Sequence, residues 1–170
     1  PIIMGHEAAG EVVQVDAAVQ GWVIGDRGTF DCVVHCGNCF YCQRGAQNLC
    51  EDLLFNNGAY AEFIRIPARI VQRNLYEIPA HVSYRDAALS EPLACVIRGF
   101  EETGVKPGDN VVVLGLGPIG LMFVRLAKLY GTRVIAIGRR RTQIDRAARM
   151  GADEVISSHS TPDPVQPVRD

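Results

Sequence analysis

Four cysteines within residues 36–50 are the residues whose type and spacing indicate chemistry most directly. They follow the pattern Cys-X2-Cys-X2-Cys-X7-Cys and are Cys36, Cys39, Cys42 and Cys50. Zinc prefers tetrahedral ligation by sulfur, and gaps of two residues let successive thiolates turn back onto one ion. Because four sulfur ligands leave no open coordination position, we expect this zinc to brace a loop and to take no part in a reaction.

Two other states of these cysteines remain open from the spacing. An iron–sulfur cluster is disfavoured because the bacterial ferredoxin pattern has a shorter last gap followed by proline, whereas Glu51 follows Cys50 here. Free or disulfide-bonded cysteines are the remaining alternative. Cys32 and Cys95 stand apart from the cluster, and as single cysteines we expect them to be small buried residues.

The adjacent residues His6 and Glu7, next to Gly5, are the first candidates for catalytic chemistry. A histidine beside a carboxylate on a bend can offer a nitrogen and an oxygen to one metal ion. A lone His-Glu pair is more often an ordinary polar turn, however. Spacing alone therefore favours the simpler interpretation.

A glycine-rich turn at residues 115–120 lies between elements typical of a nucleotide-binding fold. The apolar run before it suits a parallel strand buried on both faces, and the apolar run after it suits a helix. The expected elements are a strand at 111–114, a helix at 119–130, a strand at 134–137, a helix at 142–150 and a strand at 154–157.

In this setting the turn predicts a dinucleotide site. We expect Gly115 to make the tight turn, Gly117 to let the backbone approach a pyrophosphate and Gly120 to let the helix lie close to the strand. The phosphates would bind at the helix N-terminus, where Pro118 and Ile119 stand. A glycine turn that binds no nucleotide is the alternative.

The end of the second expected strand indicates which cofactor binds. A site for NAD usually has an acidic residue there, but this chain has Gly138 followed by Arg139, Arg140 and Arg141. Guanidinium groups suit the 2′-phosphate of NADP, so NADP is favoured over NAD. The alternative is that these arginines form a solvated helix start, in which only Arg139 or Arg140 matters.

The composition excludes several classes of function. Of the 170 residues 48% are hydrophobic, which suffices for a core, and the net charge of −2 gives no sign of nucleic-acid binding. No apolar run reaches membrane-spanning length and no leader opens the chain. Six cysteines without a leader fit a reducing compartment, so we expect a cytoplasmic protein. Both ends look cut, and we expect a fragment.

The residues before about position 80 predict a β-rich region, most like a small barrel or sandwich. After it, a helical pattern begins near Ser83 and is interrupted by Pro92. The strands expected before this change lie within residues 9–15, 21–34, 58–67 and 69–79, and the helical pattern covers residues 84–103.

Four motifs in order, Gly-His-Glu, the cysteine cluster, Glu-Pro-Leu and Gly-X-Gly-X-X-Gly, resemble the zinc-dependent medium-chain alcohol dehydrogenases. The likeness covers residues 1–158 and is strongest to the polyol (sorbitol-type) and threonine dehydrogenase branch. It implies a partial GroES-like β-barrel domain at 1–82, N-terminally truncated and carrying the zinc lobe 36–50. A C-terminally truncated Rossmann domain at 83–170 would supply the first half of a doubly wound parallel sheet.

The resemblance also implies an activity. The family transfers hydride reversibly between an alcohol, here a polyol or secondary alcohol, and NAD(P), while a catalytic zinc polarises the substrate oxygen. His6 would be a ligand of that zinc, and Glu7 a neighbouring ligand or a carboxylate that supports one. Glu91 falls where the polyol branch binds the metal directly or through water. The four clustered cysteines match the structural zinc ligands.

The resemblance leaves two functions open. In the family a further ligand, a cysteine, precedes the Gly-His-Glu turn, and the rest of the Rossmann sheet and the dimer-forming strands follow the position of Ser158. One hypothesis is therefore an enzyme acting on a small-molecule alcohol or carbonyl compound, homo-oligomeric when full-length, without nucleic-acid or membrane partners. The other is a non-catalytic zinc- and nucleotide-binding fragment that lacks a complete active site.

Overall fold

The computed structural model describes residues 2–161, 163 and 166. The chain divides into two compact units, Pro1–Glu91 and Pro92–Asp170, each described separately below. Helix α3 (Ser90–Glu102) crosses this division. The boundary expected after residue 82 stays a prediction. In the part of the chain that the structure describes, no helix is long and apolar enough to cross a membrane.

Two small antiparallel sheets form the first unit. Strand β2 (Arg27–Phe30) lies between β1 (Ala9–Glu11) and β5 (Leu75–Glu77), while β3 (Val33–Val34) pairs with β4 (Leu54–Phe55). The core of this unit has Phe30, Cys32, Val34 and Ile70 as its buried members. This core supports the loops that carry the candidate ligands.

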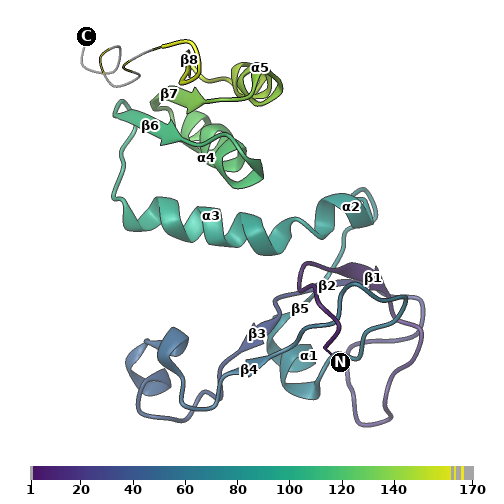
Figure 1. Ribbon diagram of the computed structural model, residues 1–170. Coiled ribbons are helices and arrows are strands. Elements are labelled where there is room, and N and C mark those ends of the chain that lie inside the picture. The colour runs from purple at the N-terminus through teal and green to yellow at the C-terminus, as the bar shows by residue number, and fades with distance from the viewer. Residues whose placement is uncertain (1, 162, 164–165, 167–170) are drawn as a thin grey trace. The chain divides into compact units, whose positions relative to one another are not determined.

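The segment between β3 and β4 projects from that strand pair as a separate lobe (Figure 1). It contains the four clustered cysteines and two short 3-10 turns, η1 (Cys42–Arg44) and η2 (Gln47–Leu49). No residue of either turn is buried. Apolar packing therefore does little for this lobe, which is consistent with the expectation that metal ligation stabilises it.

One expected strand in this unit is wrong, and the strand expected within residues 69–79 occupies only part of that range. Residues 69–79 form helix α1 (Ala68–Asn74) and only then strand β5, because the helical turn places Ile70 fully buried in the core. No strand occurs in the fully described stretch 58–67. There the amides of Gly58 and Ala59 donate to a carbonyl of the loop before β1, so tertiary contacts override the local β propensity. The strand expected at 9–15 is shorter and ends at Glu11.

The helical pattern after Ser83 divides into α2 (Tyr84–Ala87) and α3. Ser83 caps α2, since its hydroxyl accepts the backbone N–H of Asp86 at 3.1 Å. The predicted break at Pro92 is wrong. This proline lies in the first turn of α3, where a missing N–H and a fixed φ are tolerated, and the break falls before Ser90.

The second unit confirms the expected order of strand, turn, helix and strand. Strands β6 (Asn110–Leu114), β7 (Arg133–Gly138) and β8 (Glu154–Ser157) form a parallel sheet in that order. Helices α4 (Pro118–Leu129) and α5 (Arg141–Arg149) connect them. The boundaries differ from the expected ones by at most one residue.

Successive side chains along these strands point to opposite faces of the sheet, and the second unit has buried residues on both faces. One face of the sheet packs with α4 and α5 through Val113, Val134, Ala136, Leu121, Val124, Ala127 and Ala147. The opposite face carries a smaller buried group of Ile135, Ile137 and Ile156. Both faces of β7 are thus apolar, as its uninterrupted hydrophobic sequence predicts.

Candidate functional site

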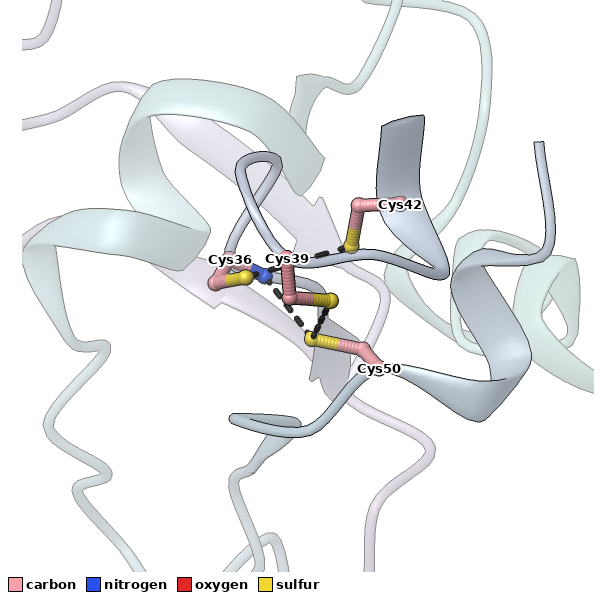
Figure 2. Close-up of side chains that lie close together, drawn as sticks. All are labelled: Cys36, Cys39, Cys42 and Cys50. Carbon is pink, nitrogen blue, oxygen red and sulfur yellow. Dashed lines mark hydrogen bonds between the residues drawn. The ribbon is translucent and has the colours of Figure 1, made fainter. Parts of the chain in front are cut away.

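The four clustered cysteines converge as the spacing predicts. Their Sγ atoms all lie within 4.8 Å of one another, and Figure 2 shows the side chains turned toward a common centre. The Sγ atoms of Cys36 and Cys42 are 3.9 Å apart, and those of Cys39 and Cys50 are 4.0 Å apart. Tetrahedral zinc with Zn–S bonds of about 2.3 Å requires sulfur atoms about 3.8 Å apart, so this donor set fits zinc.

Backbone N–H groups around the cluster stabilise thiolates. The N–H of Asn38 lowers the pKa of Cys36, and the N–H of Cys42, together with that of Glu51, lowers the pKa of Cys39 to about 6. The amide of Cys36 donates to the Cys50 sulfur at 3.2 Å. Removal of its thiol from water instead raises the pKa of Cys42 to about 12. A metal ion would have to displace a proton from this thiol.

Two glycines allow the tight bends of the lobe. Gly37 and Gly45 have φ values of +87° and +76°, in the left-handed region that residues with a Cβ rarely adopt. Gly45 ends η1, and its N–H donates to the carbonyl of Cys42 at 3.3 Å. The side chain of Arg44 folds back over the ring of Phe40, with Cζ 3.6 Å from the ring centroid. The chain reversals that bring the cysteines together are therefore local.

A second group of possible ligands lies in the first unit. One ligand atom each from His6, Glu7 and Glu91 lies within 4.8 Å of the others. His6 and Glu91 are half-buried, whereas Glu7 is exposed. One nitrogen and two oxygen donors suit zinc and would leave a coordination position for substrate or water. The structure thus brings together the three residues that the resemblance singled out.

The turn that carries His6 is fixed by backbone contacts. The carbonyl of Gly5 accepts the N–H groups of Gly58 and Ala59 at 2.9 and 3.0 Å, and Met4 accepts the N–H of Tyr60 at 3.0 Å. Gly5 has φ +94°, and a Cβ on it would lie 2.8 Å from the ring of Tyr60. Only glycine fits there, which explains the first residue of the Gly-His-Glu motif.

Thr29 connects the two halves of this ligand group. Its hydroxyl lies 2.9 Å from the carbonyl of Ala8 and 3.2 Å from the hydroxyl of Ser90. Ala8 follows Glu7 and Ser90 precedes Glu91, so one buried threonine on β2 ties together the segments that carry both carboxylates. Nothing in the sequence singled out Thr29, because the residues it joins are far away along the chain.

The glycine turn of the second unit has the geometry of a dinucleotide site. Gly115 has φ +97°, and its N–H donates to the carbonyl of Ile137 at 2.9 Å. A Cβ on Gly120 would lie 1.8 Å from the Gly115 carbonyl oxygen, whereas a Cβ on Gly117 would meet nothing within 4 Å. Gly120 is thus required for close packing, and Gly117 leaves open space beside the helix start.

That open space is a groove of about 410 Å³ over the start of α4. No side chain of the described residues caps the helix at Gly117, so its first N–H groups are available to an anion. The groove includes all five residues predicted in the turn; its lining comprises Val113, Leu114, Gly115, Gly117, Pro118, Ile119, Gly120 and Phe123.

The three other predicted cofactor residues lie at the end of β7. Gly138 is adjacent to the glycine turn, since a Cβ on it would lie 2.6 Å from Cδ1 of Leu116. Arg139 and Arg140 are exposed, and neither takes part in the ion pairs found among the described residues. Arg141 instead pairs with Asp145 at 3.0 Å. The exposed side chains of Arg139 and Arg140 are thus candidates for contact with a ligand.

The two cysteines outside the cluster differ in their exposure to solvent. Cys32 is 1% exposed and belongs to the core of the first unit, which confirms its expected burial. Cys95 is exposed, so the expectation that it is buried is wrong. It lies on α3 one position before the buried Val96, and therefore on a different side of the helix. No disulfide occurs among the described residues.

Comparison with known families agrees with these geometries. Residues 1–80 match the alcohol dehydrogenase GroES-like domain, and residues 118–170 match the zinc-binding dehydrogenase domain. The chain belongs to the zinc-dependent medium-chain alcohol dehydrogenases. Its fold is accordingly a GroES-like domain followed by a partial Rossmann-like parallel sheet.

The curated relatives of this chain include sorbitol dehydrogenases. Sorbitol dehydrogenase of Bacillus subtilis is 35% identical over 92% of the chain and 45% of its own length. The chain thus spans about half the length of the curated relatives it matches.

Solved structures of dehydrogenases are also similar to this chain over about half of their own length. A zinc-binding dehydrogenase structure from Sinorhizobium meliloti bound to NADP has a TM-score of 0.86 and 36% identity, over 95% of this chain and 47% of that one. An Escherichia coli CFT073 alcohol dehydrogenase complexed with NADH has a TM-score of 0.78 and 30% identity, over 93% and 48%. Close structural relatives therefore bind either nicotinamide cofactor.

Proposed function

We propose that the whole protein is a zinc-dependent dehydrogenase that transfers hydride between a polyol or secondary alcohol and NADP. The observation that carries this proposal is the convergence of His6, Glu7 and Glu91, whose donor atoms lie within 4.8 Å of one another. The sorbitol dehydrogenase relative supports a polyol substrate. Bound zinc would act as a Lewis acid on the substrate oxygen.

In this proposal the residues of the chain have three roles. His6 supplies a ligand nitrogen, and Glu91, beside it in the first unit, supplies a carboxylate oxygen. Glu7 is a further ligand or hydrogen-bonds to a metal-bound water. The Cys36–Cys50 cluster holds a structural zinc, because its four sulfur atoms leave no position for substrate.

The glycine turn would bind the cofactor pyrophosphate at the N-terminus of α4, where Gly117 allows close approach. Preference for NADP rests on Arg139 and Arg140, which no described carboxylate neutralises. Each can donate charge-assisted hydrogen bonds to a 2′-phosphate, which NAD lacks. The relative with bound NADP supports this choice, although another relative binds NADH.

The remaining proposals concern the protein in its cell. We infer a cytoplasmic location because the four clustered cysteines are arranged to hold a metal ion, which fits a reducing compartment. The partner would be a small-molecule alcohol or carbonyl compound rather than nucleic acid or membrane, and the complete protein would be a homo-oligomer like its family.

Zinc content and activity test this proposal together. The purified chain is dialysed exhaustively, its zinc is measured by elemental analysis, and NADPH oxidation is followed with ketoses and aldehydes. About two zinc ions per chain, falling to about one in His6→Ala, would support the second metal site. One zinc ion in both proteins together with a flat trace would refute it for this chain and favour the non-catalytic zinc- and nucleotide-binding alternative.

A further inference from the structure

Helix α1 holds both arms of the zinc lobe, here defined as residues 35–37 and residues 50–52. Arg69 donates from Nη1 to the carbonyl of Asp52 at 2.9 Å and pairs with its carboxylate at 2.8 Å. One turn further along the helix, Arg73 donates from Nη1 to the carbonyl of His35 at 3.0 Å. Residues four apart lie on the same face of a helix, so one face of α1 contacts both arms.

Arg73 also packs against the turn that carries the first ligand. Its two terminal nitrogens lie 2.9 Å from where a Cβ on Gly37 would stand. Gly37 follows Cys36, and its own N–H donates toward the Cys42 sulfur. Arg73 therefore covers the outside of a turn whose inner side faces two of the four sulfurs.

The two arginines differ in whether a carboxylate neutralises their charge. Arg69 is neutralised by Asp52, with side chains 33% and 67% exposed. No described carboxylate pairs with Arg73. Four thiolates around one divalent ion carry two net negative charges, and a cation packed against the ligand-bearing turn compensates part of that charge.

We propose that Arg73 is a positioning and charge-compensating residue for the structural zinc, and that Arg69 braces the opposite arm of the lobe. This proposal rests on zinc occupying the cysteine cluster. It assigns to α1 the task of setting the separation of the two arms before metal binds. The 3-10 turns of the lobe contain no buried residue that could do so by apolar packing.

This assignment can be tested by measuring the zinc affinity of the purified chain. The chain competes for zinc with a chromophoric chelator at two salt concentrations. Arg73→Gln should weaken the affinity of the lobe by about tenfold, the lower end of the range for residues that support metal ligands. Arg73→Lys, which keeps the charge, should recover most of the loss. Arg69→Gln should cost less than about threefold, because exposed ion pairs contribute little.

Arg85→Gln is the matched control, since it removes an exposed arginine of the first unit outside the lobe. High salt should weaken the effect of Arg73→Gln, because a charge contribution is screened and a purely mechanical one is not. Equal zinc affinities for Arg73→Gln and Arg85→Gln would overturn the assignment, and so would failure of Arg73→Lys to recover affinity. A wild-type chain without zinc in the cluster would instead refute the structural zinc site of the proposed function.

Discussion

The hydroxyl groups of Thr29 and Ser90 lie 3.2 Å apart, and this contact links strand β2 to the residue before Glu91. Thr29 has one proton to donate, and two carbonyl oxygens lie within its reach, that of Ala8 at 2.9 Å and that of Ala87 at 3.3 Å. When that proton is on a carbonyl, Ser90 is the donor to Thr29. A single buried side chain thus relates the positions of Glu7 and Glu91.

Thr29→Val should destabilise the first unit and weaken the second metal site. The substitution leaves the Ala8 carbonyl without its donor at a residue that is 8% exposed, which costs about 1–3 kcal/mol. Urea unfolding would measure the stability and elemental analysis the second zinc ion. Thr29→Ser keeps the hydroxyl and should behave like wild type. Unchanged stability and zinc content in Thr29→Val would show that this contact positions nothing.

Gly117→Ala and Gly120→Ala should fail in different ways. A Cβ on Gly117 meets nothing within 4 Å, so the protein should stay folded but lose at least about tenfold in NADPH affinity through blocked pyrophosphate approach. A Cβ on Gly120 would lie 1.8 Å from the Gly115 carbonyl oxygen, so that variant should lose stability. Thermal unfolding and NADPH fluorescence separate the two effects. Normal NADPH binding by Gly117→Ala would argue against the pyrophosphate site.

Arg139→Gln and Arg140→Gln should each raise the dissociation constant for NADPH by about tenfold and leave that for NADH unchanged. Each loses a charge-assisted hydrogen bond that only the 2′-phosphate can accept. Arg141→Gln is the control, since Arg141 already pairs with Asp145. Fluorescence titrations with both cofactors would measure the effect. A parallel loss of NADH affinity would mean that the arginines act on the pyrophosphate instead.

Zinc binding by the cysteine cluster should release protons and weaken as the pH falls. At pH 7 Cys39, with a pKa of about 6, is mainly thiolate, whereas Cys42, with a pKa of about 12, holds its proton. Binding at pH 7 therefore displaces the Cys42 proton, and below about pH 6 it must displace the Cys39 proton as well.

Calorimetric zinc titrations in buffers of different ionisation enthalpy would count these protons. The number should rise as the pH is lowered from 7.5 to 5.5, and the affinity should fall more steeply over the same interval. Cys95→Ser, which changes a cysteine outside the lobe, should leave both quantities unaltered. An affinity independent of pH in this interval would contradict the expected thiol ligation.

Asp153→Asn should destabilise the second unit at neutral pH by about 1 kcal/mol. Asp153 accepts Lys128 Nζ at 2.7 Å and the backbone N–H of Val134 at 2.7 Å, which joins α4 to β7. Bonds to a charged group contribute about 1.5–3 kcal/mol, discounted here because the carboxylate side chain is 40% exposed.

The hydrogen bond from Lys128 lowers the pKa of Asp153 below its ordinary value. This stabilisation is fully present above the unfolded pKa of about 3.9 and is lost as the pH falls through the lower folded value. Urea unfolding of both proteins at pH 7 and near pH 3 would test this, and the difference should shrink in acid. Asp145→Asn, at an exposed pair with Arg141, should change stability by less than about 0.5 kcal/mol.

The second unit was predictable from sequence almost residue by residue. Its strands are short apolar runs, its helices begin at Pro118 and Arg141, and its signals are all local. The strands and helices of the first unit were predicted less well. Within residues 69–79 the expected strand is confined to β5, because the residues before it form α1 and bury Ile70. Residues 58–67 form no strand, and Gly58 and Ala59 bond to the Gly5 turn rather than to a sheet.

The sequence by itself determined the cysteine cluster, the glycine turn and the arginines after β7, because their chemistry follows from residue type at short spacing. Only the tertiary structure decided how His6 and Glu7 meet Glu91, since loops and packing set distances between residues far apart in the chain. The same holds for Thr29, whose contacts cross from β2 to α3. It also holds for the arginines of α1, because contacts with both arms of the zinc lobe exist only once helix and lobe pack together.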